Sequence, residues 1–293
     1  MARCSSVFLA LLLLTSTAAL AKSKAPARPP AAPEMPPDFQ IIGWSKDEKR
    51  FAARVYDLDM ENNELDEPPP YCPGYVSHRG KKFRGALRLQ LFDGKQSTGT
   101  WNIQEAQPCT PPETARDRLA QANEALAQQG VDLLSVGGIA APAQKAKTTT
   151  KRKSRSSLTT AVSAVVLPSG PWAGQRVEIT CRVDTKDNAA PNEDSSGAMT
   201  SRATFTVGLR SGKTLNPLGE FTLGPTEWSE MQAGFWTATF DRLLLSPSGK
   251  SFVVLGHLEE GNVRGGSSSS VVLGLVELPA RPEPTSAVSA PAH

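Results

Sequence analysis

An acidic run at residues 57–67 gathers the oxygen ligands that a hard cation binds. Asp57, Asp59 and Glu61, at alternate positions of this run, match the first, third and fifth positions of the helix-loop-helix calcium pattern. Asn62 stands where that pattern needs a turn glycine, and Pro68 where it needs a bidentate glutamate. We expect a solvated acidic loop here, with a calcium site as the alternative. The candidate ligands are Asp57, Asp59, Glu61 and Glu64.

A second candidate for chemistry is the stretch Gly208-Leu-Arg-Ser-Gly212-Lys213-Thr214, which resembles a phosphate-binding loop. Three residues separate its glycines, whereas the phosphate loop has four. That loop also needs a following helix whose amides hold the phosphate, and Pro217 argues against one. The stretch therefore predicts a hairpin turn.

The sequence contains none of the motifs that are typical of nucleophilic or metal-assisted hydrolysis. The three histidines, His78, His257 and His293, are far apart in the sequence, and neither a Gly-x-Ser-x-Gly elbow nor a His-Glu-x-x-His motif occurs. We therefore expect a protein that is not an enzyme and has no cofactor. A hydrolase built from carboxylates at distant positions is the less favoured alternative.

The first residues have the three-part plan of a secretory signal peptide. Arg3 precedes an apolar stretch at residues 7–14, and small residues follow up to Ala19-Leu20-Ala21. The apolar stretch is shorter than the ~20 residues that cross a bilayer, and no later one is longer. The sequence thus predicts a signal peptide at 1–21 and an exported protein, either periplasmic or extracellular, without a transmembrane segment after cleavage.

Three cysteines remain after cleavage, in an oxidising compartment. Cys72 and Cys109 lie in proline-rich segments that flank the same hairpin, so we expect them to form a disulfide. Cys181 belongs to an apolar alternation with Ile179 and Val183, which predicts a small buried hydrophobic residue and a free thiol.

The elements that would position these residues are mostly strands, and the predicted fold class is mainly β (α+β) with antiparallel sheets. Two hairpins are expected at residues 39–56 and 87–103, followed by one helix of about five turns that begins with a capping box at Thr110-Pro111-Pro112-Glu113 and ends at Gly130. Leu119, Ala122 and Leu126 should form its packing face. In the second half, strands are expected at 161–167, 177–183, 203–209, 237–245, 251–258 and 271–278.

Composition divides the chain further. Alanine and proline dominate a tether at 22–37, a tail at 280–293 is predicted to be disordered, and the two halves at 38–139 and 158–279 are expected to be separate domains. A flexible basic linker is expected at 140–157, where contact with anionic surfaces is the functional alternative. Its cations are Lys145, Lys147, Lys151, Arg152, Lys153 and Arg155.

The net charge of the whole chain is only +3, and no aromatic residue lies in the basic segment, so nucleic acid is not an expected partner. We expect a secreted or periplasmic protein that binds a protein or envelope polymer through loops such as residues 57–75 and 261–270. A structural or assembly component of the envelope is the alternative.

One turn pattern occurs twice. The stretch from Ile42 to Ala52 is echoed by the stretch from Leu244 to Val253. Both have a strand, a turn with a serine and a basic residue, and a second strand, and both resemble the hairpin of β-propeller blades. Together with the helical segment at 115–130, these hairpins resemble a family of predicted secreted bacterial proteins of unknown function. That resemblance implies no catalytic residues.

Export gives the first testable prediction. We expect signal peptidase to cleave after Ala21, because Ala19 and Ala21 occupy the small-residue positions of the cleavage site. N-terminal sequencing of exported material should begin at or near Lys22. Recovery of chains that retain Met1 from the cytosol would contradict this.

Overall fold

Strands dominate the structure, a computed structural model that describes residues 39–59, 76–78, 81–105, 109–144, 146–189, 197–229, 234–262 and 265–281. They form antiparallel sheets and are accompanied by one helix in this part of the chain, which confirms the predicted fold class. All of these residues belong to one compact unit, Met35–His293.

The first sheet contains both predicted hairpins, and its strands follow the order β3-β4-β2-β1-β6, with β5 also paired to β4. Alternating apolar residues and short polar turns explain the hairpins, since one face of each strand packs inward. Its strands are β1 (Phe39–Ser45), β2 (Arg50–Asp59), β3 (Val76–His78), β4 (Lys81–Asp93), β5 (Gln96–Gln104) and β6 (Val131–Asp132).

The helix α1 (Pro112–Gln128) has the predicted length, and proline occupies its first turn. Its end is also confirmed, because Gly130 has a φ of +75° and donates its N–H to the carbonyl of Ala127. The capping box is wrong: no side chain caps the helix, and Thr110 Oγ1 instead accepts the N–H of Glu105 at 2.9 Å. Leu119 is 39% exposed, so the packing face is formed by Ala122 and Leu126.

Two further sheets contain the second half of the chain. The second sheet has the order β12-β11-β10-β9-β8 and the third has β15-β14-β13-β7. The second comprises β8 (Lys147–Lys153), β9 (Ser156–Val166), β10 (Arg176–Asp187), β11 (Ala198–Ser211) and β12 (Thr214–Ser229). The third comprises β7 (Ile139–Ala140), β13 (Phe235–Leu245), β14 (Ser251–Asn262) and β15 (Gly265–Glu277).

All six strands predicted in the second half are present, and these two sheets contain three more that were not predicted, β7, β8 and β12. The strand β12 contains Pro217 and Pro225, which usually interrupt a sheet. It lies at the edge of the second sheet, where one side of the strand needs no backbone partner and proline is tolerated. The turn at Gly212, with a φ of +59°, joins β11 to β12, so the phosphate-loop look-alike is the predicted hairpin turn.

The structure differs from the expected linker and from one expected loop. Lys147–Lys153 in the basic segment form β8, which pairs along its whole length with β9. The expected loop at 261–270 is mostly strand, because Gly265 to Ser270 continue β15 and pair with β14. Neither Lys147–Lys153 nor Gly265 to Ser270 includes an apolar residue, and backbone pairing with the neighbouring strand is what extends them as strands.

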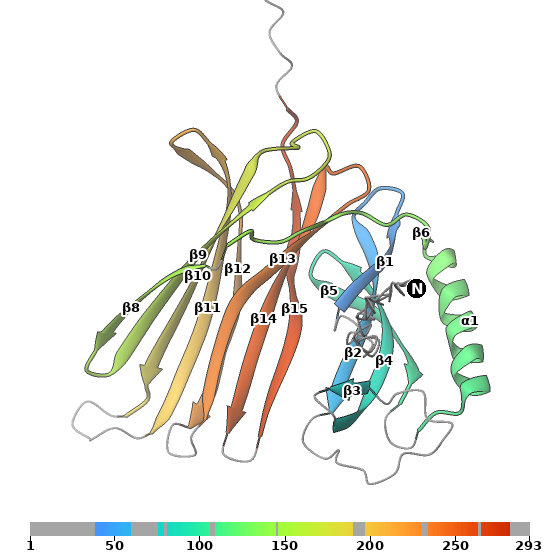
Figure 1. Cartoon of the computed structure of the whole chain (residues 1–293), viewed down its shortest axis with the longest axis horizontal. Helices are drawn as coiled ribbons and strands as arrows, with labels where there is room; N and C mark the ends of the chain where they lie inside the picture. The colour runs from blue at the N-terminus through green and yellow to red at the C-terminus, as the bar shows by residue number, and fades with distance from the viewer. Residues whose placement is uncertain are drawn as a thin grey trace, which may run out of the picture. The chain divides into compact units, whose positions relative to one another are not determined.

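The third sheet lies between the other two and is buried on both faces (Figure 1). Along β14, Phe252 and Val254 pack toward the second sheet, whereas Val253 and Leu255 pack toward the first. All four are fully buried, and each such side chain contributes about 1.5–3 kcal/mol of burial free energy. The first sheet packs its other face on α1 through Ala122 and Leu126. The two halves therefore share a core and are not separate domains.

The turn between β13 and β14 touches the connection between β9 and β10. A Cβ atom on Gly249 would lie 2.6 Å from the Cα of Gly170, and Gly249 has a φ of +67°. Only glycine therefore allows this approach of two backbones.

Replacing Gly249 by alanine should lower the free energy of unfolding by about 2–4 kcal/mol, through both the positive φ and the backbone clash. Gly212→Ala is the matched control, since Gly212 has a similar φ and nothing within 4 Å of its added Cβ. It should lose only about 1–2 kcal/mol. Urea unfolding measures both, and equal losses would mean that the contact with Gly170 does not matter.

Candidate functional site

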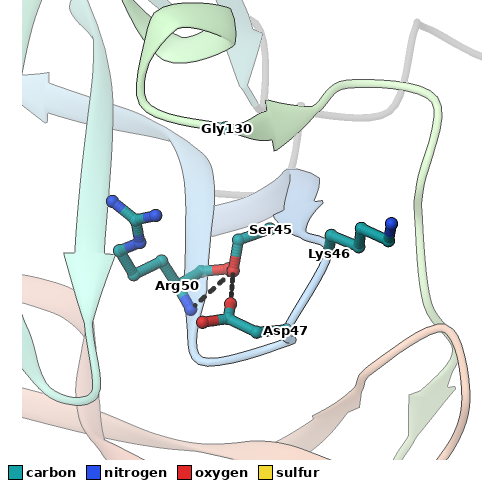
Figure 2. A pocket seen from close by; sticks show the side chains of 5 residues that line it. All are labelled: Ser45, Lys46, Asp47, Arg50 and Gly130. Carbon is teal, nitrogen blue, oxygen red and sulfur yellow. Dashed lines mark hydrogen bonds between the residues drawn. The ribbon is translucent and has the colours of Figure 1, made fainter.

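A shallow hollow lies beside the turn between β1 and β2 (Figure 2). Ser45 ends the first strand, Arg50 begins the second, and Gly130 closes the hollow from the end of α1. Lys46 and Asp47 complete its lining. The side chains of Lys46 and Arg50 point away from the paired Ser45 and Asp47.

The polar groups of this hollow are used by the turn itself. The hydroxyl of Ser45 donates to Asp47 Oδ1 at 2.6 Å and accepts the backbone N–H of Arg50 at 3.0 Å. The hydrogen bond from the Ser45 hydroxyl lowers the pKa of Asp47, and the hydrogen bond from the backbone N–H of Lys49 lowers it further. The lowered pKa makes Asp47 a weak base, and the Ser45 hydroxyl is engaged in holding the turn.

The turn between β13 and β14 repeats this arrangement. Ser246 Oγ accepts the N–H of Ser251 at 3.2 Å, as Ser45 Oγ accepts that of Arg50. The residue three positions after each serine donates its N–H to the serine carbonyl at 2.9 Å and has a positive φ, +56° at Glu48 and +67° at Gly249. The echo in the sequence therefore corresponds to one turn structure that is used twice.

The two turns also bind each other. The carboxylate of Glu48 accepts the backbone N–H of Ser248 at 2.9 Å and its hydroxyl at 2.6 Å, which joins the first sheet to the third. Burial raises the pKa of Glu48, but the serine hydrogen bonds and the charge of Lys250 outweigh it, so the pKa lies below its usual value. The ionised carboxylate is the form that holds the two turns together.

His257 and Cys181 are the remaining described groups that suggest catalysis. His257 Nε2 lies 3.0 Å from Ser268 Oγ and 3.4 Å from Glu259 Oε1. A catalytic triad places the hydroxyl and the carboxylate on opposite ring nitrogens, so this cluster lacks its geometry. Cys181 is free and buried, as predicted, and burial raises its pKa to about 12. Its Sγ donates to the carbonyl of Ala238 at 3.3 Å, which is a packing role.

Several predicted site residues fall outside what the structure describes. Glu61, Glu64 and Cys72 lie outside the described residues, and for Asp57 and Asp59 only the backbone of β2 is described. Calcium binding by the acidic run and the disulfide of Cys72 with Cys109 therefore stay predictions. Among the described residues no group of three or more His, Cys, Asp or Glu side chains is placed to hold a metal ion.

The outer side of the second sheet carries a cluster of cations, which we call the basic face. Residues with odd numbers on β10 and β11, such as Val183 and Ala203, pack into the core, so the even positions point outward. Pairing through β9 places the odd positions of β8 on the same outer side. The basic face consists of Lys147, Lys151 and Lys153 of β8, Arg182 and Lys186 of β10, and Arg202 of β11.

Strand register brings these six cations together. Lys153 and Lys186 both pair with Ser156, from opposite sides of β9. One row further along, Lys151, Leu158, Asp184 and Arg202 lie side by side. Leu158 is half-buried, and the three charged members of this row are exposed.

The charges of the basic face are not neutralised by neighbours. None of its six cations forms an ion pair within the described part of the chain, although Asp184 lies among them and Glu227 of β12, opposite Thr200, lies at the rim beside Arg202. Glu178, on the same outer side, is instead engaged by Arg210, whose Nε and Nη2 lie 3.0 and 2.8 Å from one carboxylate oxygen. The sequence showed the cations of β8 as a run, but only alternation combined with register adds those of β10 and β11.

Comparison of the chain with family models, curated proteins and solved structures gave no match. In the part of the chain that the structure describes, no helix is both long and apolar enough to cross a membrane.

The Glu48 contact predicts a pH dependence. Because its folded pKa is depressed, the contact stabilises the protein above the unfolded pKa near 4.5 and is lost as the pH falls through the lower folded value. Glu48→Gln should therefore cost about 1–2 kcal/mol at pH 7, with the difference from wild type vanishing toward pH 3.

Denaturant unfolding across pH measures this effect, and Glu277→Gln, at an exposed strand end, is the control. A loss at Glu48 that stays constant down to pH 3 would show that the ionised carboxylate is not what matters.

Proposed function

We propose that this is an exported, non-enzymatic binding protein whose basic face captures a polyanionic partner of the cell envelope or its surroundings. The observation that carries the proposal is the set of six exposed cations on one face, none of which forms an ion pair within the described residues. Export rests on the signal-peptide pattern at residues 1–21.

The spacing of the cations supports a polymer in preference to a small anion. Neighbouring strands lie about 4.8 Å apart, so Lys153 and Lys186, on either side of β9, are separated by roughly 10 Å across the sheet. The six cations are spread over three strands, β8, β10 and β11, and do not come from a single loop. A chain of regularly spaced anionic groups would contact several of them at once.

The side chains that surround the cations limit the kinds of partner that the basic face could bind. The cations are interleaved with Thr149, Thr160 and Thr204, and the described neighbours on this side include no aromatic ring. Stacking of sugars or bases would need such rings. Recognition would therefore depend on charge, with hydrogen bonds from threonine hydroxyls.

Protection of the sheet edge does not explain the whole cluster. Lysine on an edge strand commonly prevents aggregation, which accounts for β8. Arg182, Lys186 and Arg202 lie on interior strands, where the backbone is already paired on both sides. Their place beside β8 favours a shared binding surface.

The triple variant Lys151→Glu, Arg182→Glu, Lys186→Glu should weaken binding to heparin and to poly-L-glutamate at least tenfold, because it reverses the centre of the basic face. A control triple of Lys46→Glu, Lys95→Glu and Lys213→Glu makes the same change in net charge at exposed turns. Titrations at about 0.05 and 0.3 M salt should show affinity falling with salt for wild type. If binding weakened equally in both triple variants, net charge alone would explain the effect and the basic face would not be the binding site.

A further inference from the structure

Within the described residues, the strand β8 has one backbone edge without a partner strand. It is the last strand of the second sheet, and β9 is its one partner among the described strands. All seven of its side chains are exposed, and it lies at the outer edge of the sheet in Figure 1. An edge strand of this kind presents a row of N–H and C=O groups that another extended chain can pair with.

Both faces of this edge are cationic. Side chains alternate along a strand, so Lys151 and Lys153 point to the outer side while Arg152 points to the other. Arg152 therefore lies outside the basic face, and a polyanion bound flat on that face would not reach it. Only a ligand that runs along the edge meets Lys151, Arg152 and Lys153 together.

The same charges work against pairing with a second copy. Two β8 strands placed edge to edge would bring lysine and arginine close to one another, and like charges opposite each other destabilise a strand pair. A strand with acidic side chains would instead be attracted at each of these positions. The edge thus discriminates between partners by charge.

We propose that β8 accepts an extended acidic segment of a partner polypeptide, which adds as a further strand to the second sheet. This rests on the proposed function and specifies its ligand as a protein. Backbone hydrogen bonds would hold the added strand, and carboxylates on both of its faces would meet the cations. Thr148, Thr149 and Thr150 keep the centre of β8 extended, since β-branched residues favour strands.

The sequence of β8 also defines the pattern that an antiparallel partner should have. Three consecutive acidic residues would lie opposite Lys153, Arg152 and Lys151. Three uncharged strand-forming residues would follow opposite the threonines, and a last acidic residue would face Lys147. An anionic polysaccharide has no backbone amides with which to continue the ladder, which is why a polypeptide fits this edge better.

The test uses the full mature chain and the fluorescent peptide Glu-Glu-Glu-Thr-Val-Thr-Glu. Two control peptides carry the same charges but have N-methyl groups on alternate residues, one in each phase. N-methylation removes amide donors without changing charge, so at least one control should bind tenfold or more weakly. Lys151→Glu with Lys153→Glu should abolish binding of the unmodified peptide.

The outcomes separate this inference from the proposed function. If both N-methylated peptides bind as well as the unmodified one, or if no peptide binds while heparin does, strand addition is wrong and the basic face remains a charge-based site. If neither peptides nor heparin and poly-L-glutamate bind, both proposals fail. Dimers that form without peptide and prevent the peptide from binding would identify a second copy as the occupant and overturn the inference.

Discussion

Burial of the third sheet on both of its faces is the constraint on which the rest of the structure depends. Leu243, Leu245, Phe252 and Val254 pack on the second sheet, while Leu244, Val253 and Leu255 pack on the first. Because successive residues point to opposite faces, the segments buried on both sides, 243–245 and 252–255, are unbroken apolar runs without polar alternation. Each outer sheet then has one face committed to the core. The outer face of the second sheet is left to solvent, and there the chain places its cations.

The repeated turn fixes the ends of these layers. Buried sheets can slide over each other with little change in apolar contact, since hydrophobic burial has no direction. Hydrogen bonds and backbone contacts are directional, and two of them meet at the turn between β13 and β14. Glu48 binds Ser248 from the first sheet, and Gly170 meets Gly249 from the second. One short turn therefore sets the position of all three sheets, which gives the internal echo of the sequence a structural explanation.

Local patterns predicted those elements whose own residues determine them. The hairpins at β1–β2 and β4–β5, the helix, the six strands of the second half and the free, buried Cys181 follow from alternation, turn residues and helical spacing. The strands β8 and β12 could not be found in this way. The lysines of β8 and the prolines of β12 are not typical of strands, and both segments are extended because they pair with β9 and β11. The capping box failed because Thr110 has a competing partner in Glu105. Division into two domains failed although the runs 243–245 and 252–255 already indicated strands buried on both sides.

The candidate site was harder to predict than the fold, because the pairing register of three strands brings its cations together. Each cation of the basic face is an ordinary exposed residue in its own strand, and the chain as a whole has a net charge of only +3. Pairing places Lys153 and Lys186 roughly 10 Å apart, close to the Debye length of about 8 Å at physiological salt, so their fields still overlap. The six cations therefore repel one another in the free protein, and an anionic ligand relieves that repulsion in addition to the attraction of each contact. Such a cluster is unfavourable for stability and unnecessary for the core, and this is why we propose that it serves recognition.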